Sequence, residues 1–497
     1  MAAVALTVYV ATLAPGLTFE HYGTDGGDLI AAARTLGVPH PSGYPTYTLL
    51  AWLFSHLPLG VVAYRVNLLS AVCAAGAVGL LCRVAQLLLP ADEHPFALSA
   101  ATALSLAFSS LLWSQAVISE VYALLALFAA LLLWLLVRWR NGGGDGFLWL
   151  AAFVFGLGLG NHLTLAFAAP PALPLLWRER QRWFQRRVLL PAMFSFLAGL
   201  SVYVYLPLAA AHQPAVNWGN PQTWDRFLWV VTARQYQPFV FGLDPAEIPG
   251  RLPAWAGLLG DQFGWWGLAI ALAGAWWCWQ RDRGFALFAV TWMLLAGVYA
   301  FFYNTGDSHV YLLPAILLLA LWWAEGARYL LRLARCLRPL GRRLALAAVL
   351  LLPLGSLALH WQAADPDDDW LVHTYIHQTL EDVAPGGLIV VRGDRATFAL
   401  WYGLYAEGQR PDVAVVSGPL LAYTWYRDQV RHLYPDLTLT EPTAADVTTD
   451  DLVRALIADN VARRPIYATD PSEAWKAWFD FVKEGKAAIY RLRSKSQ

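Results

Sequence analysis

Charged residues are scarce in this chain. Only 14% of its 497 residues are Asp, Glu, Lys or Arg, while 58% are hydrophobic. A soluble globular chain usually carries about 25% charged residues. Because this chain cannot cover its apolar surface with charge, the composition excludes an ordinary soluble protein and favours one that lies in lipid.

Other scarcities narrow the function. Acidic and basic residues balance to a formal net charge of zero, which argues against a nucleic-acid partner. The four cysteines lack metal-ligand spacing, so we expect neither a structural disulfide nor a zinc site. GxGxxG and Walker loops are also missing, which argues against nucleotide binding.

Long apolar runs are what the chain does have. A membrane helix needs about 20 apolar residues, and fewer where it is broken or partly buried. We therefore expect about eleven transmembrane helices. They lie at 2–17, 64–89, 96–113, 120–139, 147–160, 163–177, 187–209, 265–280, 284–303, 309–325 and 343–361. The first run lacks a basic leader and an A-x-A-like cleavage site, so we interpret it as a retained helix.

Arginine-rich segments follow alternate spans and predict the orientation. These segments are 138–140, 177–187, 281–283 and 328–343. The positive-inside rule makes their side cytoplasmic, and the N-terminus with it. We expect the opposite, outer face of the cell membrane to carry two long loops, 18–63 and 210–264, and the C-terminal part.

The composition changes near residue 361. Two buried-strand patterns, LIVVRG and DVAVVS, flank a helical pattern, ATFALWYGLYAEG, and PIYATD (465–470) resembles a third strand. This order predicts a small α/β domain with a parallel sheet. We interpret Asp394, which follows the first strand, as a helix cap. The predicted domains are therefore a transmembrane domain, 1–361, and an extracytoplasmic soluble domain, 362–497.

Two carboxylates in the first outer loop need an explanation. Asp25 and Asp28 flank two glycines, and a carboxylate at the membrane surface must be solvated or paired. A helix cap for LIAAARTLG, a general base, a metal site and a proton pathway are four open explanations. A metal site would need more oxygen ligands, for which Asp307 and Glu120 are available. The spans hold few acids, which weakens the pathway explanation.

Polar residues of other outer turns add to this face. His40 lies in PHPSGYP, a turn made rigid by proline, while Glu120 lies in ISEVYALL and His162 in GLGLGNHLTL. Each alone has an ordinary explanation, such as helix-start electrostatics or a hydrogen-bonded interfacial histidine. Together, on one face of a membrane bundle, they predict a polar site.

The second long loop holds a predicted interfacial helix, TWDRFLWVVTARQY. Thr223 caps it, one face is apolar, and Arg226 and Arg234 flank it. Arginines beside an apolar face are typical of a helix that lies at the membrane surface.

A family resemblance begins with TDGGDLIAAARTLGVPHPSGYPTYTLLAWL, followed by YRVNLLSAVCAA. These segments resemble the opening of protein O-mannosyltransferase-like polytopic membrane proteins, a family formerly described as a domain of unknown function. The family pattern has an Asp, two small residues and Glu or Asp, and then a His-Pro-Pro-Gly-x-Pro turn. Glu-Val-Tyr, Gly-Asn-His and Gln-Tyr turns follow. The matching positions here are Asp25 and Asp28, His40 to Pro45, Glu120 to Tyr122, Gly160 to His162, and Gln235 with Tyr236. Two positions depart from it: Asp28 where Glu is common, and Ser42 where Pro is common.

The resemblance implies a C-type glycosyltransferase (GT-C) fold, used with polyprenyl-phosphate sugars on the outer side of the membrane. It implies transfer of mannose or another hexose to an acceptor hydroxyl, such as that of a protein Ser or Thr. Phosphate is already a good leaving group, so the enzyme must chiefly supply a base for the hydroxyl. We predict Asp25 as that base, with Asp28 orienting it or holding the acceptor. No cofactor is expected, with a divalent cation as the open alternative.

The remaining predicted site residues bind substrate. They are His40, Tyr44, Glu120, Tyr122, His162, Arg226, Arg234 and Asp307. Three alternative functions stay open: a transporter or flippase of lipid-linked glycans, a glycosyltransferase for polysaccharide or lipid acceptors, and an assembly protein that binds through its outer domain.

Overall fold

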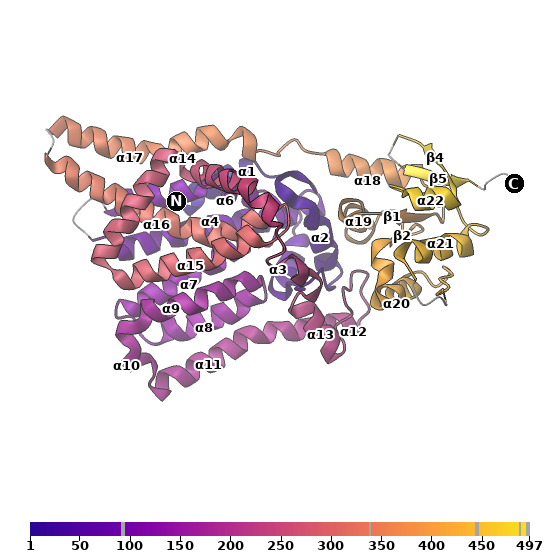
Figure 1. Cartoon of the computed structure of the whole chain (residues 1–497), viewed down its shortest axis with the longest axis horizontal. Coiled ribbons are helices and arrows are strands. Elements are labelled where there is room, and N and C mark those ends of the chain that lie inside the picture. The colour runs from indigo at the N-terminus through magenta and orange to yellow at the C-terminus, as the bar shows by residue number, and fades with distance from the viewer. Residues whose placement is uncertain (91–94, 337–338, 443–446, 487–488, 494–497) are drawn as a thin grey trace.

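The computed structural model describes residues 1–90, 95–336, 339–442, 447–486 and 489–493. A body of helices occupies most of the molecule, and a small sheet domain lies at one end (Figure 1). The helices of the body are α1 (Ala2–Ala11), α2 (Gly26–Arg34), α3 (Pro45–Ser55), α4 (Val62–Leu88), α5 (Pro95–Ala107), α6 (Ser110–Ala116), α7 (Tyr122–Arg140), α8 (Gly146–Leu159), α9 (Ala169–Leu176), α10 (Arg180–Trp183), α11 (Arg186–Leu200), α12 (Tyr205–Ala211), α13 (Trp224–Val231), α14 (Ile248–Arg281), α15 (Arg283–Phe302), α16 (Leu313–Leu333) and α17 (Pro339–His360).

Several of these helices can cross a membrane. In the described residues six are long and apolar enough: Val62–Leu88, Tyr122–Arg140, Arg186–Ala211, Arg283–Phe302, Ser308–Cys336 and Pro339–His360. Helices α5 and α6, bent by 65°, make a seventh span if they count as one. A multi-pass membrane protein is therefore confirmed. The count of eleven stays a prediction, because the other expected spans are shorter, broken or kinked helices here.

Burial separates a central span from peripheral ones. The apolar window of Ser308–Cys336 is 100% buried within the protein, whereas those of Arg186–Ala211 and Pro339–His360 are 22% and 17% buried. An apolar helix with so much exposed surface needs lipid around it. The central span, α16, is preceded by a short 3-10 turn, η7 (Ser308–Leu312), which brings polar residues to one end of the bundle.

The sheet domain has the predicted parallel core. Strands β1 (Leu388–Val391), β2 (Ala414–Ser417) and β3 (Ile466–Ala468) match the three strand patterns, and β1 pairs in parallel with both others. Two strands were not predicted, β4 (Asp480–Glu484) and β5 (Ile489–Arg493), which extend the sheet antiparallel in the order β2-β1-β3-β5-β4. β4 escaped prediction because it is largely exposed and lacks an apolar pattern.

Helices surround this sheet and connect it to the body. They are α18 (Leu371–Asp382), α19 (Asp394–Trp401), α20 (Thr424–Leu433), α21 (Thr449–Asn460) and α22 (Glu473–Trp478). The predicted helix between β1 and β2 is confirmed as α19 and a following π-helical turn, Tyr402–Ala406. Figure 1 shows α19 next to α2 at the end of the body.

The two glycines beside Asp25 and Asp28 allow this contact. Helix α2 begins with them and is buried from Gly26 to Ala33. A Cβ atom on Gly27 would collide with the backbone carbonyl of Phe398 in α19. A rigid backbone neighbour cannot rotate away, so only glycine lets the two helices approach this closely.

We expect Gly27→Ala to destabilise the full chain by about 1–3 kcal/mol, the usual cost of overpacking a close contact. Thermal unfolding in detergent or lipid discs measures the change. Gly250→Ala is the matched control, because Gly250 is also helical, in α14, and a Cβ there would meet nothing within 4 Å. Equal melting temperatures for the two variants would contradict the close approach of α2 and α19.

Candidate active site

Asp28 is a buried hydrogen-bond acceptor that joins three segments. Its side chain is inaccessible to solvent, and Oδ1 accepts a bond of 2.9 Å from Trp218 Nε1. Its Oδ2 accepts from the backbone N of His40 at 2.9 Å and from His40 Nδ1 at 2.8 Å. Asp28 therefore holds α2, the proline turn and the start of the second long loop in one arrangement.

His40 connects this buried carboxylate to Asp25. With Nδ1 on Asp28, the other ring nitrogen, Nε2, lies 3.6 Å from Asp25 Oδ2. Tyr44 packs edge-on against the His40 ring, with centroids 5.0 Å apart, and Phe398 stacks on it at 6.4 Å. Asp28, His40 and Asp25 thus form a line that leads from the interior to the surface of a cavity.

The cavity has a volume of about 370 Å³ and a polar, aromatic wall. It contains His40, three carboxylates and six tyrosines. These are Asp25, Asp307 and Asp394, with Tyr22, Tyr44, Tyr122, Tyr236, Tyr303 and Tyr311. Rings and hydroxyls together suit a sugar, which presents apolar C–H faces and hydrogen-bonding hydroxyls.

Burial and nearby charges shift the pKa values of Asp25 and His40, which lie side by side in the cavity wall. Desolvation raises the pKa of Asp25 to about 6, against the opposing effect of His40. Burial lowers the pKa of His40, but Asp25 and the hydrogen bond to Asp28 outweigh it and bring the value to about 9. At neutral pH the pair is therefore a carboxylate beside an imidazolium.

The predicted residues divide into two groups. Tyr44, Tyr122 and Asp307 line the cavity together with Asp25 and His40, although they come from four separate parts of the chain. The other predicted residues, Asp28, Glu120, His162, Arg226 and Arg234, are not part of its wall.

Glu120 and His162 are buried close to the wall. Glu120 Oε2 accepts from the backbone N of Val121 at 3.3 Å, and desolvation raises the pKa of this carboxyl well above its usual value. His162 Nδ1 pairs with Thr164 Oγ1 at 2.8 Å. Burial, and then the charge of His40, lower the pKa of His162 to about 4. A neutral, buried His162 is poorly suited to neutralise a phosphate.

The arginines of the second long loop lie outside the cavity wall. The predicted helix is confirmed as α13 (Trp224–Val231), and the Thr223 side chain accepts from the Arg226 backbone N at 3.4 Å; its place at the membrane surface stays a prediction. Arg234 is exposed and begins a 3-10 turn, η5 (Arg234–Phe239), whose Tyr236 lines the cavity. Arg234 is thus two positions along the chain from Tyr236, a residue of the cavity wall.

Sequence reasoning missed several wall residues. Asp394 does not cap α19, because the cap position is Gly393 and no side chain accepts a capping bond; the carboxylate lines the cavity instead. Its position at the carboxyl end of a parallel strand was the available signal. Tyr303 and Tyr311 gave no signal, since tyrosines are common at membrane surfaces.

The geometry does not favour the metal explanation. Within the described ranges no three His, Cys, Asp or Glu side chains are grouped so that they could hold a metal ion. Asp28, one of the proposed ligands, already accepts three hydrogen bonds.

Two solved structures share the fold of this chain. The crystal structure of ArnT from Cupriavidus metallidurans bound to undecaprenyl phosphate matches 99% of this chain and 97% of its own, with a TM-score of 0.64 and 13% identity. The apo structure matches 99% and 96%, with a TM-score of 0.56 and 14% identity. The fold is that of a C-type (GT-C) glycosyltransferase, with a small sheet domain.

Two stretches of the sequence match family models. Residues 25–185 match "Protein O-mannosyl-transferase TMEM260 N-terminal domain", and residues 372–436 match "TMEM260-associated domain 2". Over these two stretches the chain is similar to the TMEM260 family of membrane proteins. The protein O-mannosyl-transferase TMEM260 of Mus musculus is 30% identical over 83% of this chain and 62% of its own length. Protein O-mannosyl-transferase tmem260 of Dictyostelium discoideum is 23% identical over 82% and 55%. The chain thus spans 62% and 55% of these relatives.

Proposed function

We propose that this protein is a membrane glycosyltransferase that moves mannose or another hexose from a polyprenyl-phosphate carrier to a hydroxyl of a protein acceptor. The placement of Asp25 carries the proposal: a carboxylate with a pKa of about 6 lies in a tyrosine-rich cavity beside His40. The names of the relatives and the lipid-bound ArnT structure support the choice of sugar, acceptor and carrier.

In the proposed reaction Asp25 is the general base. Its carboxylate takes the proton of the acceptor hydroxyl, and the oxygen attacks the anomeric carbon. The bond from that carbon to the phosphate oxygen breaks, so polyprenyl phosphate leaves with the bonding electron pair. Because this is one displacement, the product has the inverted anomeric configuration.

The leaving phosphate needs positive charge and hydrogen-bond donors. Because its pKa is about 9, His40 carries a positive charge at neutral pH. The tyrosine hydroxyls of the wall can donate hydrogen bonds to the phosphate. Arg226 and Arg234 stay as proposed contacts to the phosphate at the membrane surface, where the lipid chain would enter. The reaction calls for no cofactor, because the donor already carries its leaving group.

The other residues are assigned to binding and support. Tyr44, Tyr122 and Asp307 would bind sugar hydroxyls, since they line the cavity. Glu120 and His162 would support the wall from behind. The cavity and the sheet domain lie on the outer side of the cell membrane in this proposal, and the N-terminus lies in the cytoplasm.

The direct test offers defined polyprenyl-phosphate hexoses to the full chain in lipid discs, with Ser- or Thr-containing peptides, glycans and lipids as acceptors. Transfer to peptide, with inverted configuration by NMR, is expected. A retained configuration would overturn the single displacement, and transfer only to glycan or lipid would overturn the protein acceptor. Lipid movement across the bilayer without transfer would favour the flippase alternative.

The pH profile of kcat/KM should be bell-shaped. Asp25 must lose its proton to act as a base, so activity should rise as pH increases through about 6. His40 must keep its proton to stabilise phosphate, so activity should fall as pH increases through about 9. Initial rates between pH 5 and 10 measure both limbs. A flat profile across this range would contradict the assigned roles.

Arg234→Ala should raise the KM for the lipid donor about fivefold and leave kcat within about twofold, because a surface cation mainly contributes to phosphate binding. Arg234→Lys keeps the charge and should recover most of the loss. Donor titrations at saturating acceptor measure both constants. An unchanged KM in the alanine variant would remove Arg234 from the phosphate site.

A further inference from the structure

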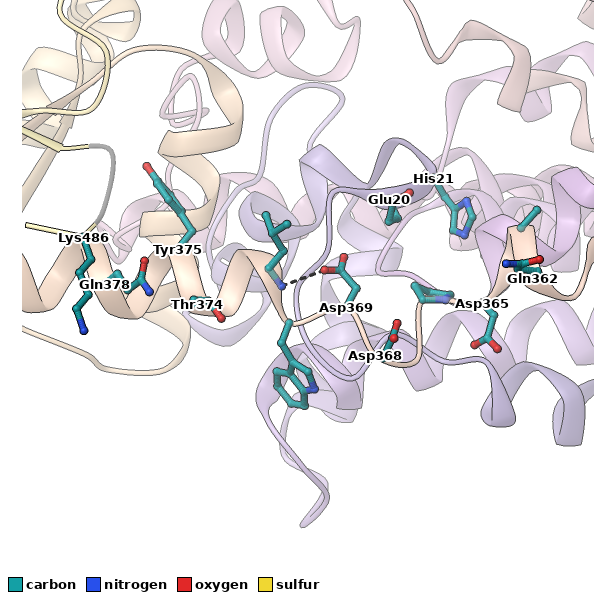
Figure 2. A pocket seen from close by; sticks show the side chains of 14 residues that line it. Glu20, His21, Gln362, Asp365, Asp368, Asp369, Thr374, Tyr375, Gln378 and Lys486 are labelled. Atoms are coloured by element: carbon teal, nitrogen blue, oxygen red, sulfur yellow. Dashed lines mark hydrogen bonds between the residues drawn. The ribbon is translucent and has the colours of Figure 1, made fainter.

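An acidic groove lies where the helical body meets the sheet domain. Its volume is about 890 Å³, and η1 (Glu20–Asp25), the segment before α18, and α18 itself line it. The wall has four carboxylates, Glu20, Asp365, Asp368 and Asp369, against one lysine, Lys486. Figure 2 shows the carboxylates near His21, while Lys486 lies at the opposite end of the groove.

In the part of the chain that the structure describes, two of these carboxylates accept no hydrogen bond and form no ion pair, so they can meet a ligand. Asp369 accepts hydrogen bonds from the Thr18 hydroxyl and from the backbone N of Leu371, so its charge is partly engaged. Glu20 and Asp368 are exposed side chains on opposite sides of the groove. Their uncompensated charge favours a cationic ligand and disfavours a phosphate.

The groove, a smaller pocket and the cavity that contains Asp25 are lined by successive residues of η1. His21 belongs both to the groove and to a smaller bridging pocket of about 180 Å³. Tyr22 belongs both to this bridging pocket and to the Asp25 cavity. Since the next residues of the same segment lead to Asp25, the three spaces follow η1 along the chain.

The bridging pocket contains a polar atom without a partner. Gln115 lines it and is 1% exposed, and its Nε2 donates to the His21 carbonyl at 3.1 Å. Within the described residues its Oε1 has no hydrogen-bond partner. A buried carbonyl oxygen left unpaired costs about 1–3 kcal/mol, so a donor that reached Gln115 Oε1 would stabilise this site.

We propose that the acidic groove and the bridging pocket receive an extended segment of the acceptor polypeptide, with basic residues in the groove and a Ser or Thr hydroxyl at Asp25. This inference rests on the proposed function and names the acceptor class. A backbone N–H of the segment would pair with Gln115 Oε1, and lysine or arginine side chains would face Glu20 and Asp368. The lipid phosphate, which the groove repels, would reach the cavity from another side.

The test measures binding and transfer separately, with the full chain in discs of zwitterionic lipid. Three fluorescent peptides of equal length carry one Thr flanked by Lys, by Glu or by neutral residues. The variants are Glu20→Gln with Asp368→Asn, and Asp367→Asn as the matched control. Asp367 is exposed in the same segment as Asp368 but does not line the groove.

The wild type should bind the Lys peptide most tightly, and the double variant should weaken this binding about five- to tenfold. The control variant should bind as the wild type does, and raised salt should abolish the preference. In transfer assays the double variant should raise the KM for the Lys peptide, whereas the Asp367→Asn control should leave it unchanged. Melting temperatures confirm that all variants are folded.

These results test the peptide groove and the proposed glycosyltransferase function independently of each other. Equal binding of the Lys and Glu peptides, or an equal loss in the Asp367→Asn control, would overturn the groove even if sugar is transferred. Charge-selective binding without transfer from any polyprenyl-phosphate sugar would support the groove as a peptide site and overturn the glycosyltransferase proposal.

Discussion

Asp25→Asn should lower kcat for sugar transfer by at least about a hundredfold, the usual contribution of a positioned general base. Asparagine has nearly the same shape and keeps a hydrogen-bonding oxygen toward His40, but it cannot accept the acceptor's proton. Folding should be unaffected, because the carboxylate is at the cavity wall and its raised pKa means that its surroundings do not favour the charge. Single-turnover transfer with saturating donor measures the chemical step.

Asp307→Asn is the matched control for this variant. Asp307 lines the same cavity, and the substitution removes the same charge. If Asp307 binds a sugar hydroxyl, the control should mainly raise KM, whereas Asp25→Asn should mainly lower kcat. Unchanged turnover in Asp25→Asn, or an equal loss of kcat in both variants, would remove Asp25 from the role of base.

Asp28→Asn should have the second largest effect, on both stability and activity. Asp28 accepts three hydrogen bonds, and an amide cannot accept all three without directing its own NH₂ group at a donor. Losing a buried charged partner costs about 3 kcal/mol. Without the Asp28 charge the pKa of His40 should also fall, because that carboxylate helps to raise it.

The pH profile distinguishes positioning from a purely structural role. In Asp28→Asn the alkaline limb should move to lower pH, while the acidic limb should change little, because Asp28 is a minor contributor to the pKa of Asp25. Asp28→Glu keeps the carboxylate, which the family pattern also allows, and should recover part of the activity and stability. A stable Asp28→Asn protein with an unshifted alkaline limb would contradict the arrangement.

Local patterns were enough to predict the elements that carry the site. The apolar runs identified the multi-pass body, and the short strand patterns located β1, β2 and β3. TDGGD and PHPSGYP placed Asp25, Asp28 and His40 in one outer loop, on the same face of the bundle. Burial pattern and turn chemistry act over a few residues, so one sequence suffices to read them.

The different positions of Asp25 and Asp28 were not predictable from these patterns. Asp25 directly precedes α2 and Asp28 lies in its first turn, so by local rules either carboxylate could stabilise the start of this helix. Trp218, 190 positions further along, binds Asp28 and buries it, while Asp25 remains at the cavity wall. That bond joins distant segments, and no local rule describes it.

By itself the sequence determined a membrane chain with a polar outer loop, a rigid His-Pro turn and a small α/β domain, because composition and periodicity decide burial against lipid or water. Only the tertiary structure decided which carboxylate faces the cavity, that Asp394 of the sheet domain joins it, and that Arg226 and Arg234 lie outside its wall. Those outcomes depend on how α2, α19 and η7 pack together. Packing between distant segments is set by side-chain shape and close backbone approach, as at Gly27, rather than by the order of residues within any one segment.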